Sequence, residues 1–242
     1  MKAFLLAAGN GTRLRPLTDS IPKCLVPIRG VPLLGIWLSW CRRYTIDDVL
    51  INTHVHAQAV CDYLAANDFG VRVTVSHEPE LLGSAGTLQQ NRAFVAGEPR
   101  FAILYADVLT NADFASMAAF HEEYQSSATI GVYHVAEPRH CGIVVTGENG
   151  LVTEFIEKPQ RPRSNLAFAG LMIASPAVLD EIPRKAPADI GFDLLPRLIS
   201  YMYAFTITDY LVDIGTMEKY EAAQAQWPGL CAAPEPTTCS RA

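Results

Sequence analysis

The chain has 242 residues, of which 50% are hydrophobic and 18% charged, and this length suits one large α/β domain. Its net charge of −6 provides no basic field for a nucleic acid backbone, and no window approaches the run of about 20 apolar residues that spans a membrane. The 6 cysteines show no metal-type spacing, which indicates reduced thiols in a cytoplasmic protein.

The first half of the chain alternates strand-like and helical patterns. Residues 2–7 form an apolar run that indicates a buried first strand and not a signal peptide, because the run is short and a polar loop follows it. Later patterns predict strands at 49–52, 71–76 and 101–105, and helices at 32–43, 57–66, about 85–94 and about 114–124. Repeats of this kind predict an α/β fold with a Rossmann-like, mostly parallel sheet flanked by helices.

The second half has shorter strands separated by turn residues. Strands are predicted at 129–134, 142–146, 152–156 and 168–174, and helices at 176–182, at 192–201 and from about 216. We expect these strands to form a smaller, mixed β lid over the carboxyl edge of the main sheet. No hexapeptide repeat is present, so no β-helix domain is expected.

A glycine-rich loop follows the first predicted strand, at the edge where open α/β sheets bind ligands. Gly9 and Gly11 allow backbone N–H groups to approach an anion, and Arg13 can donate two hydrogen bonds to phosphate. A dinucleotide fingerprint is excluded because Leu14 stands where a third glycine is needed, and the Gly-Lys-Ser/Thr of a P-loop is absent. Taken alone, the two glycines fit an ordinary turn as well as they fit a phosphate-binding loop.

A longer pattern surrounds this loop. The run LAAGNGTRLRPLT at residues 6–18, followed by IPKCLVPI at 21–28, resembles the signature of the sugar-phosphate nucleotidyltransferases. The resemblance continues at residues 82–88, 105–107, 154–159 and 212–216, and therefore reaches about residue 226. It implies a domain at 1–226, with a nucleotide-binding half at about 1–125 and a sugar-phosphate-binding half at about 126–226. Residues 227–242 are expected to form a flexible tail.

The resemblance implies attack by a sugar 1-phosphate oxygen on the α-phosphate of a nucleoside triphosphate, with release of pyrophosphate. The attacking phosphate is already a nucleophile, so the site must neutralise charge and position two anions. Arg13 is expected to neutralise the triphosphate, and Lys23, preceded by the rigid Pro22, is expected at the α-phosphate. A solvated lysine is the alternative for Lys23.

The resemblance also assigns a nucleotide-binding set. Its members come from the first loop and from a second glycine-containing segment: Leu6, Ala7, Ala8, Gly9, Gly11, Thr12, Glu78, Gly83 and Ser84. Glu78 is included as an acceptor for a base amino group, with a surface glutamate as the equal alternative.

Two aspartates from distant segments are expected to hold Mg²⁺. Asp107 directly follows the strand expected at 101–105, and Asp213 follows another short apolar run. Mg²⁺ takes few carboxylates together with phosphate oxygens and waters, so two aspartates suffice. Helix caps or turns are the alternatives. Leu211 and Met217 depart from the family pattern around Asp213, where a bulky aromatic residue and a proline are usual.

A sugar-phosphate set is implied in the second half, around the Glu-Lys-Pro motif at 157–159. Lys158 is expected to hold the phosphate and Glu157 to accept hydrogen bonds from sugar hydroxyls. The full set is Gly142, Glu157, Lys158, Asn165, Gly170 and Asp193. Phe168 stands where the family usually has asparagine, and Asp193 serves equally well as a helix cap.

Overall similarity to short mannose- and heptose-1-phosphate guanylyltransferases favours GTP as the nucleotide. Uridylyl-, thymidylyl- and cytidylyltransferases are the enzyme alternatives, and a non-catalytic subunit that binds nucleotide sugar is the alternative from another class. The expected partners are the two substrates, without nucleic acid or membrane, and a homodimer is left open.

Overall fold

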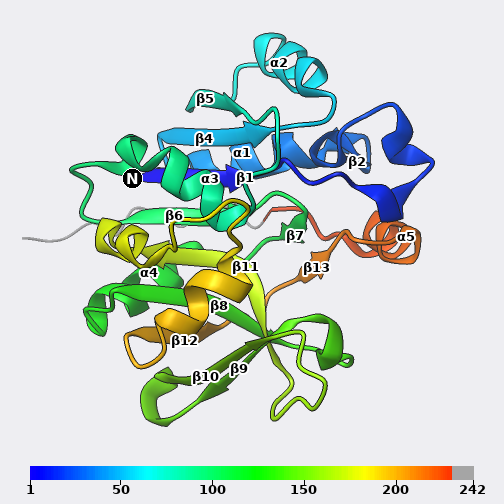
Figure 1. Ribbon diagram of the computed structural model, residues 1–242. Coiled ribbons are helices and arrows are strands. Elements are labelled where there is room, and N and C mark those ends of the chain that lie inside the picture. The colour runs from blue at the N-terminus through cyan, green and yellow to red at the C-terminus, as the bar shows by residue number, and fades with distance from the viewer. Residues whose placement is uncertain (231–242) are drawn as a thin grey trace, which may run out of the picture.

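The computed structural model describes residues 1–230, and it is organised around one nine-stranded sheet (Figure 1). Four strands of the first half lie side by side and parallel: β5 (Arg72–His77), β4 (Asp48–Thr53), β1 (Lys2–Leu6) and β6 (Phe101–Tyr105). Their carboxyl ends share one edge of the sheet, and the loops that leave this edge are the natural place for a ligand. The predicted parallel sheet is therefore confirmed.

The strands of the second half extend this same sheet. β11 (Leu166–Ala174) pairs antiparallel with β6 and with β8 (Ala128–His134), and β12 (Met202–Thr206) pairs parallel with β8. β9 (Gly142–Thr146) and β10 (Val152–Glu157) form a hairpin whose first strand also pairs with β11. The smaller, mixed β part expected in the second half is present, and hydrogen bonds along β11 make it continuous with the sheet of the first half.

One edge of β11 is shared by two different strands. Residues 166–167 pair with β9, and residues 171–174 pair with β6. Between them the register with β8 shifts, and Gly170 adopts a left-handed φ of +74°. A Cβ at Gly170 would lie 2.9 Å from the Cβ of Tyr105, so the chain needs glycine there. We call this divergence of β6 and β9 along β11 the fork.

Helices cover both faces of the sheet, as β1 illustrates. Ala3 and Leu5 face one hydrophobic core, and Phe4 faces the other. Four helices pack on the first core: α1 (Leu33–Arg43), α2 (Ala57–Ala65), α4 (Phe114–Glu123) and α5 (Met217–Gln226). α3 (Ser84–Gln90) and the short turns at Pro176–Glu181 and Leu195–Arg197 pack on the second. β1, β4 and β6 are thus buried on both sides, as their apolar runs predict, whereas the edge strand β5 has no fully buried residue.

Two small antiparallel pairs lie outside the main sheet. β2 (Pro27–Ile28) pairs with β3 (Val31–Pro32), and β7 (Val108–Thr110) pairs with β13 (Leu211–Asp213). Among residues 1–230, no helix is long and apolar enough to cross a membrane.

The segment predicted as a helix at 192–201 differs most from expectation. It forms a π-helical turn at Ile190–Leu194 and a 3₁₀ turn at Leu195–Arg197, and β12 follows, which the sequence patterns did not predict. Pro196 lacks the N–H that would continue an α-helix, and this explains the early end. The segment at 176–182 is likewise a 3₁₀ turn.

The start of the predicted tail is also corrected. Trp227 is 5% exposed and packs against Tyr210, with ring centroids 5.3 Å apart, because the segment after α5 folds back onto the first core. Ordered packing therefore continues past residue 226. Residues 231–242 of the predicted tail lie outside the described part of the chain.

Candidate functional site

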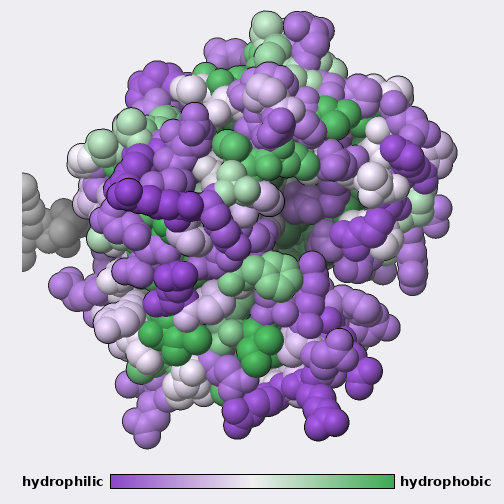
Figure 2. Space-filling view, in the orientation of Figure 1, coloured by the Kyte–Doolittle hydropathy of each residue, from purple (hydrophilic) through white to green (hydrophobic). Residues whose placement is uncertain are grey.

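The carboxyl edge of the parallel strands opens into a cavity of about 230 Å³. Figure 2 shows that this face of the molecule is hollowed between the part that carries β1 and β4 and the part that carries β9 and β10. Most of the predicted nucleotide-binding set lines the cavity: Leu6, Ala7, Ala8, Gly9, Glu78, Gly83 and Ser84. The structure thus brings together loops that follow β1, β5 and β6, and we call this space the first cavity.

Gly11 and Thr12 do not line the first cavity. Gly11 has a left-handed φ of +62°, and a Cβ there would lie 3.2 Å from the Cβ of Lys23. The carbonyl of Gly11 accepts a hydrogen bond from Thr18 Oγ1 at 2.8 Å. Gly11 therefore shapes the turn that returns the chain to Lys23, while Thr12 is exposed. A Cβ at Gly9, in contrast, would meet no atom within 4 Å, so the backbone there is open to a ligand.

Lys23 begins a 3₁₀ turn after Pro22 and carries its ammonium into the wall of the first cavity. Its side chain is only 10% exposed, so the alternative of a solvated lysine is wrong. Nζ lies 2.7 Å from Asp107 Oδ2 and 3.9 Å from Asp213 Oδ1. Three residues far apart in the sequence thus form one charge cluster, in which the Lys23 ammonium faces two carboxylates.

The pairing of β7 and β13 places the two aspartates side by side. Asp213 is in register with Val108, the residue after Asp107, and Ile214 N donates to Asp107 O at 2.8 Å. Asp107 lies in the turn between β6 and β7, and Asp213 ends β13, so neither residue caps a helix. Across residues 1–230, no group of three or more His, Cys, Asp or Glu side chains could hold a metal ion.

Arg13 lies on the exposed side of this cluster. A Cβ at Gly215 would lie 3.3 Å from Arg13 Nη2 and 2.8 Å from Asp213 Oδ2, which shows that the guanidinium is close to Asp213. Arg13 and Asp213 both line a second cavity, of about 270 Å³. Tyr105 and Asp107 line both cavities, so the two are neighbouring parts of one cleft.

The second cavity lies at the fork and contains most of the predicted sugar-phosphate set: Gly142, Glu157, Lys158 and Gly170. Glu157 is 16% exposed, and burial raises the pKa of its carboxyl group, against the opposing effect of the Lys158 ammonium 3.7 Å away. A Cβ at Gly142 would lie 2.5 Å from Glu157 Oε2, and one at Gly191 would also clash with it. Two glycines therefore make room for this carboxylate at the cavity wall.

Glu78 is buried and not at the surface, with 2% exposure. Oε1 accepts hydrogen bonds from Asn52 Nδ2 at 2.9 Å and from Thr87 Oγ1, and Oε2 accepts from Leu82 N at 3.1 Å. Asn52 Oδ1 in turn accepts from Ala7 N at 2.7 Å. This network links the first glycine loop to the segment that leads into α3. Asn52 was missed in the sequence, where its signal is a polar side chain at the end of an apolar strand.

Asn165 and Asp193 do not line either cavity. Asn165 is exposed, and its Oδ1 lies 3.0 Å from His134 Nδ1. Asp193 accepts from Asp189 N at 2.8 Å and pairs with Lys185 at 2.7 Å, and the hydrogen bond from Lys185 lowers its pKa. Asp193 lies inside the π-helical turn at Ile190–Leu194 and accepts from the backbone of Asp189, which is the residue that caps this turn. Asp189, four residues earlier, lines the second cavity in its place.

Known proteins resemble this chain over most of its length. Residues 2–228 match the model of a family described as nucleotidyl transferase. The chain is 37% identical over 220 residues to the Drosophila melanogaster mannose-1-phosphate guanylyltransferase catalytic subunit beta, which covers 88% of this chain and 59% of that protein. It is 33% identical over 238 residues to a Synechocystis UTP–glucose-1-phosphate uridylyltransferase, with coverages of 91% and 61%.

A solved structure shows the same fold. A Bacillus anthracis protein assigned as a glucose-1-phosphate thymidylyltransferase superimposes with a TM-score of 0.83 and 25% identity, covering 93% of this chain and 94% of that one. The chain spans about three fifths of the length of the two curated relatives.

Proposed function

The chain belongs to the nucleotidyl transferase family, and from that premise we propose that it joins GTP to a mannose- or heptose-type sugar 1-phosphate and releases pyrophosphate. The observation that carries this proposal is the charge cluster of Lys23, Asp107 and Asp213 at the junction of two cavities. A donor and an acceptor phosphate must meet at such a junction, and both are anions that need cations nearby.

The first cavity is proposed to take the nucleoside triphosphate. The open backbone at Gly9 allows N–H groups to approach the phosphates, and Asn52 holds this loop through Ala7 N. Lys23 lines the wall of this cavity and would stabilise charge that develops on the α-phosphate. Arg13 approaches from the second cavity and would neutralise the phosphates on the exposed side.

The donor set at Asp107 and Asp213 fits Mg²⁺. One oxygen of each carboxylate faces the same ammonium, so the two already share a position for a cation. Two carboxylates with phosphate oxygens and waters satisfy the coordination that Mg²⁺ prefers. When bound there, the ion would neutralise phosphate charge and orient the reacting groups. Lys23 would then move its ammonium from Asp107 toward the α-phosphate.

The second cavity is proposed to take the sugar 1-phosphate. Lys158 supplies a cation for the phosphate, and Glu157, held at the wall between Gly142 and Gly191, supplies acceptors for sugar hydroxyls. Gly170 lets the chain at the fork pass close to Tyr105. The attacking phosphate oxygen needs no general base, because it is ionised at neutral pH.

Pyrophosphate release tests the proposal. Four nucleoside triphosphates are assayed with Mg²⁺ against the 1-phosphates of mannose, glucose, heptose and N-acetylhexosamine. We expect the highest kcat/KM for GTP with mannose or heptose 1-phosphate. A preference for UTP, dTTP or CTP would show that the donor nucleotide carries a base other than guanine. No release with any pair would favour the non-catalytic alternative.

One alternative function is supported by a relative, and another is disfavoured by the residues of the site. The uridylyltransferase relative, at 33% identity, supports a uridylyl transfer on the same catalytic frame. A binding subunit without turnover is disfavoured because Arg13, Lys23, Asp107 and Asp213 are all retained and three of them already interact.

The cytoplasm is the proposed location, supported by the free thiols of the four described cysteines. A homodimer stays a prediction that light scattering can test.

A further inference from the structure

Phe192 exposes a large apolar side chain at the rim of the second cavity. The residue is 59% exposed, although phenylalanine is among the most frequently buried residue types. Within residues 1–230, the other strongly exposed large hydrophobic side chains are Val31, Val55, Leu81, Ile156 and Tyr201, and none of these lines the second cavity. A ring in this position has surface available for a ligand.

The backbone of Phe192 is firmly held. Phe192 lies in the π-helical turn, and its N–H donates to Asp189 Oδ1 at 3.1 Å, beside the N–H of Gly191 at 2.8 Å. Asp189 Oδ2 accepts from Ser84 Oγ at 2.9 Å, and Ser84 lines the first cavity. The carboxylate of Asp189 therefore anchors the ring to the nucleotide side of the cleft. π-Helical turns of this kind occur frequently at functional sites.

The ring faces the same space as the two charged groups of the second cavity. Lys158 Nζ lies 5.7 Å from the ring centroid, within the range of a cation–π contact. Lys158 adopts a left-handed φ of +50° directly after β10, which ends at Glu157. Gly191, next to Phe192, has no Cβ, and a Cβ there would clash with Glu157 Oε2. An apolar face, a cation and a carboxylate thus converge on one volume.

We propose that Phe192 is a specificity-determining residue whose ring packs against the C–H face of a pyranose 1-phosphate. The face of an aromatic ring carries partial negative charge, and the C–H groups of a pyranose carry partial positive charge, so the two surfaces are complementary. Lys158 and Glu157 would meet the phosphate and the hydroxyls at the periphery of the same sugar. Asp189 acts as a positioning residue, because it holds the backbone that carries the ring. This inference rests on the proposed function.

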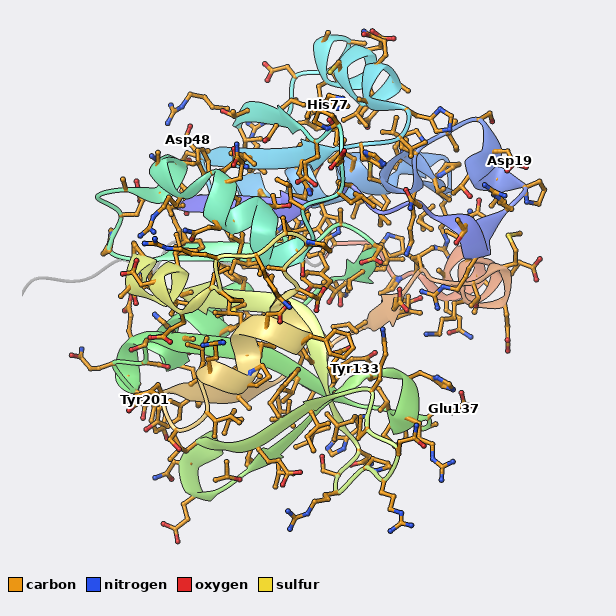
Figure 3. The ribbon with its side chains drawn as sticks, in the orientation of Figure 1. Asp19, Asp48, His77, Tyr133, Glu137 and Tyr201 are labelled. Atoms are coloured by element: carbon orange, nitrogen blue, oxygen red, sulfur yellow. The ribbon has the colours of Figure 1, made fainter. Side chains whose placement is uncertain are left out.

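Kinetic constants of Phe192→Ala test the contact. We expect the KM for mannose 1-phosphate to rise about threefold to tenfold, the scale of one lost aromatic contact, while the KM for GTP stays within twofold. Phe192→Trp keeps an aromatic face and should keep the low KM. Tyr201→Ala is the matched control, because Tyr201 is 68% exposed and Figure 3 shows it far from Tyr133, which lines the second cavity. An unchanged KM for mannose 1-phosphate in Phe192→Ala would overturn the inference.

A binding measurement separates this inference from the proposed function. The native tryptophans Trp37, Trp40 and Trp227 are at most 5% exposed, so the indole introduced by Phe192→Trp dominates quenching by acrylamide. We expect mannose 1-phosphate to protect that indole. Protection without turnover by the wild type would support the inference and refute the proposed reaction. Turnover by the wild type with no protection by the sugar 1-phosphates it uses would overturn the inference alone.

Discussion

Lys23 holds a positive charge in a nearly buried position because two carboxylates lie beside it. Asp107 is the closer partner at 2.7 Å, and Asp213 is the more distant one at 3.9 Å. Asp213 also lies 3.5 Å from Lys219, a lysine that is 48% exposed. Two lysines thus contact the same carboxylate from different environments, which supplies a natural comparison between a buried and an exposed cation.

Asp107→Asn tests the metal site. We expect kcat to fall about 100-fold or more, because a neutral amide cannot balance the charge of the cation that the reaction needs. The fold should persist, since β6 and β7 keep their backbone pairing. Circular dichroism checks the fold and pyrophosphate release checks the rate. Asp19→Asn is the control, because Asp19 pairs with Arg15 at the surface and Figure 3 shows it far from Tyr133, which lines the second cavity. Near-normal rates in Mg²⁺ would remove Asp107 from the metal site.

Lys23→Ala should affect the rate more than binding. We expect kcat to fall about 100-fold while the Kd for GTP changes by less than about fivefold, because the proposed interaction strengthens as charge develops on the α-phosphate. Stopped-flow turnover and equilibrium dialysis measure the two quantities separately. Lys219→Ala provides the exposed comparison and should change both by less than about threefold. An equal loss in binding and rate would contradict the role of Lys23 at the developing charge.

Glu157→Gln should make stability less dependent on pH. Burial raises the pKa of Glu157 above its ordinary value of 4.5, so this group's contribution to stability is full below pH 4.5 and is lost as pH rises through the raised value. Glutamine has no proton to lose. We expect Glu157→Gln to melt about 2 °C above the wild type at pH 7.5 and level with it at pH 4. Equal melting temperatures at both pH values would count against a destabilising carboxylate.

At the scale of elements, regular patterns predicted the fold well. The strand at 101–105 and the strand at 142–146 have the observed bounds, and α1 differs from its prediction by one residue. These segments have strong periodicity, which local sequence carries. β12 was not predicted, because it closely follows the irregular turns at 190–197 and its partner strand β8 lies far away in the sequence.

Residues of the site could be predicted from the sequence where they directly follow a predicted strand or belong to the family motif. Lys23, Asp107, Asp213, Glu157 and Lys158 come together at the cleft as expected, although their roles stay proposals. Asn52 and Asp189 were missed, because their importance comes from hydrogen bonds to residues 45 and 105 positions away. The contact of Asp189 leaves no local pattern in the sequence, and that of Asn52 leaves only a polar residue at the end of an apolar strand.

Two glycines with left-handed φ form a matched pair, Gly83 directly before α3 and Gly97 after the 3₁₀ turn at Arg92–Val95. Gly83 has φ +79° and ψ 161°, a region that is essentially restricted to glycine, and a Cβ there would clash with the carbonyl of Ala188. Gly97 has φ +82° but would meet nothing within 4 Å. We expect Gly83→Ala to lower the free energy of unfolding by about 3 kcal/mol or more, and Gly97→Ala by about 1 kcal/mol. Urea denaturation measures both, and equal losses would refute the steric argument.

At the scale of the whole molecule, one sheet carries both hydrophobic cores and both cavities. The segment at 188–190 of the second half bonds to the start of α3: Ala85 N and Gly86 N donate to Ala188 O at 3.0 Å. Ser84 Oγ accepts from Ile190 N at 2.8 Å. A ligand in the first cavity therefore contacts elements that are tied to the second half, and its binding energy should stabilise the entire fold.

Ligand-induced stabilisation measures this coupling. With GTP and Mg²⁺ at about 100 times the Kd, we expect a single melting transition shifted upward by about 5–10 °C. Differential scanning fluorimetry with and without EDTA checks the contribution of the metal. Asp107→Asn should lose the part of the shift that depends on Mg²⁺. Two separate transitions would show that the halves unfold independently.

At the fork, the strands beside the two cavities differ in how extensively they are paired. The first cavity is bounded by strands locked along their whole length, whereas the hairpin of β9 and β10 joins β11 through residues 166–167. The hairpin lies far from β4 and β5 (Figure 1), so we expect substitutions in it to change the second cavity more than the first. A protein engineer who wants a new sugar with the same nucleotide would graft residues 142–157 as an exchangeable part and leave the glycine loop untouched.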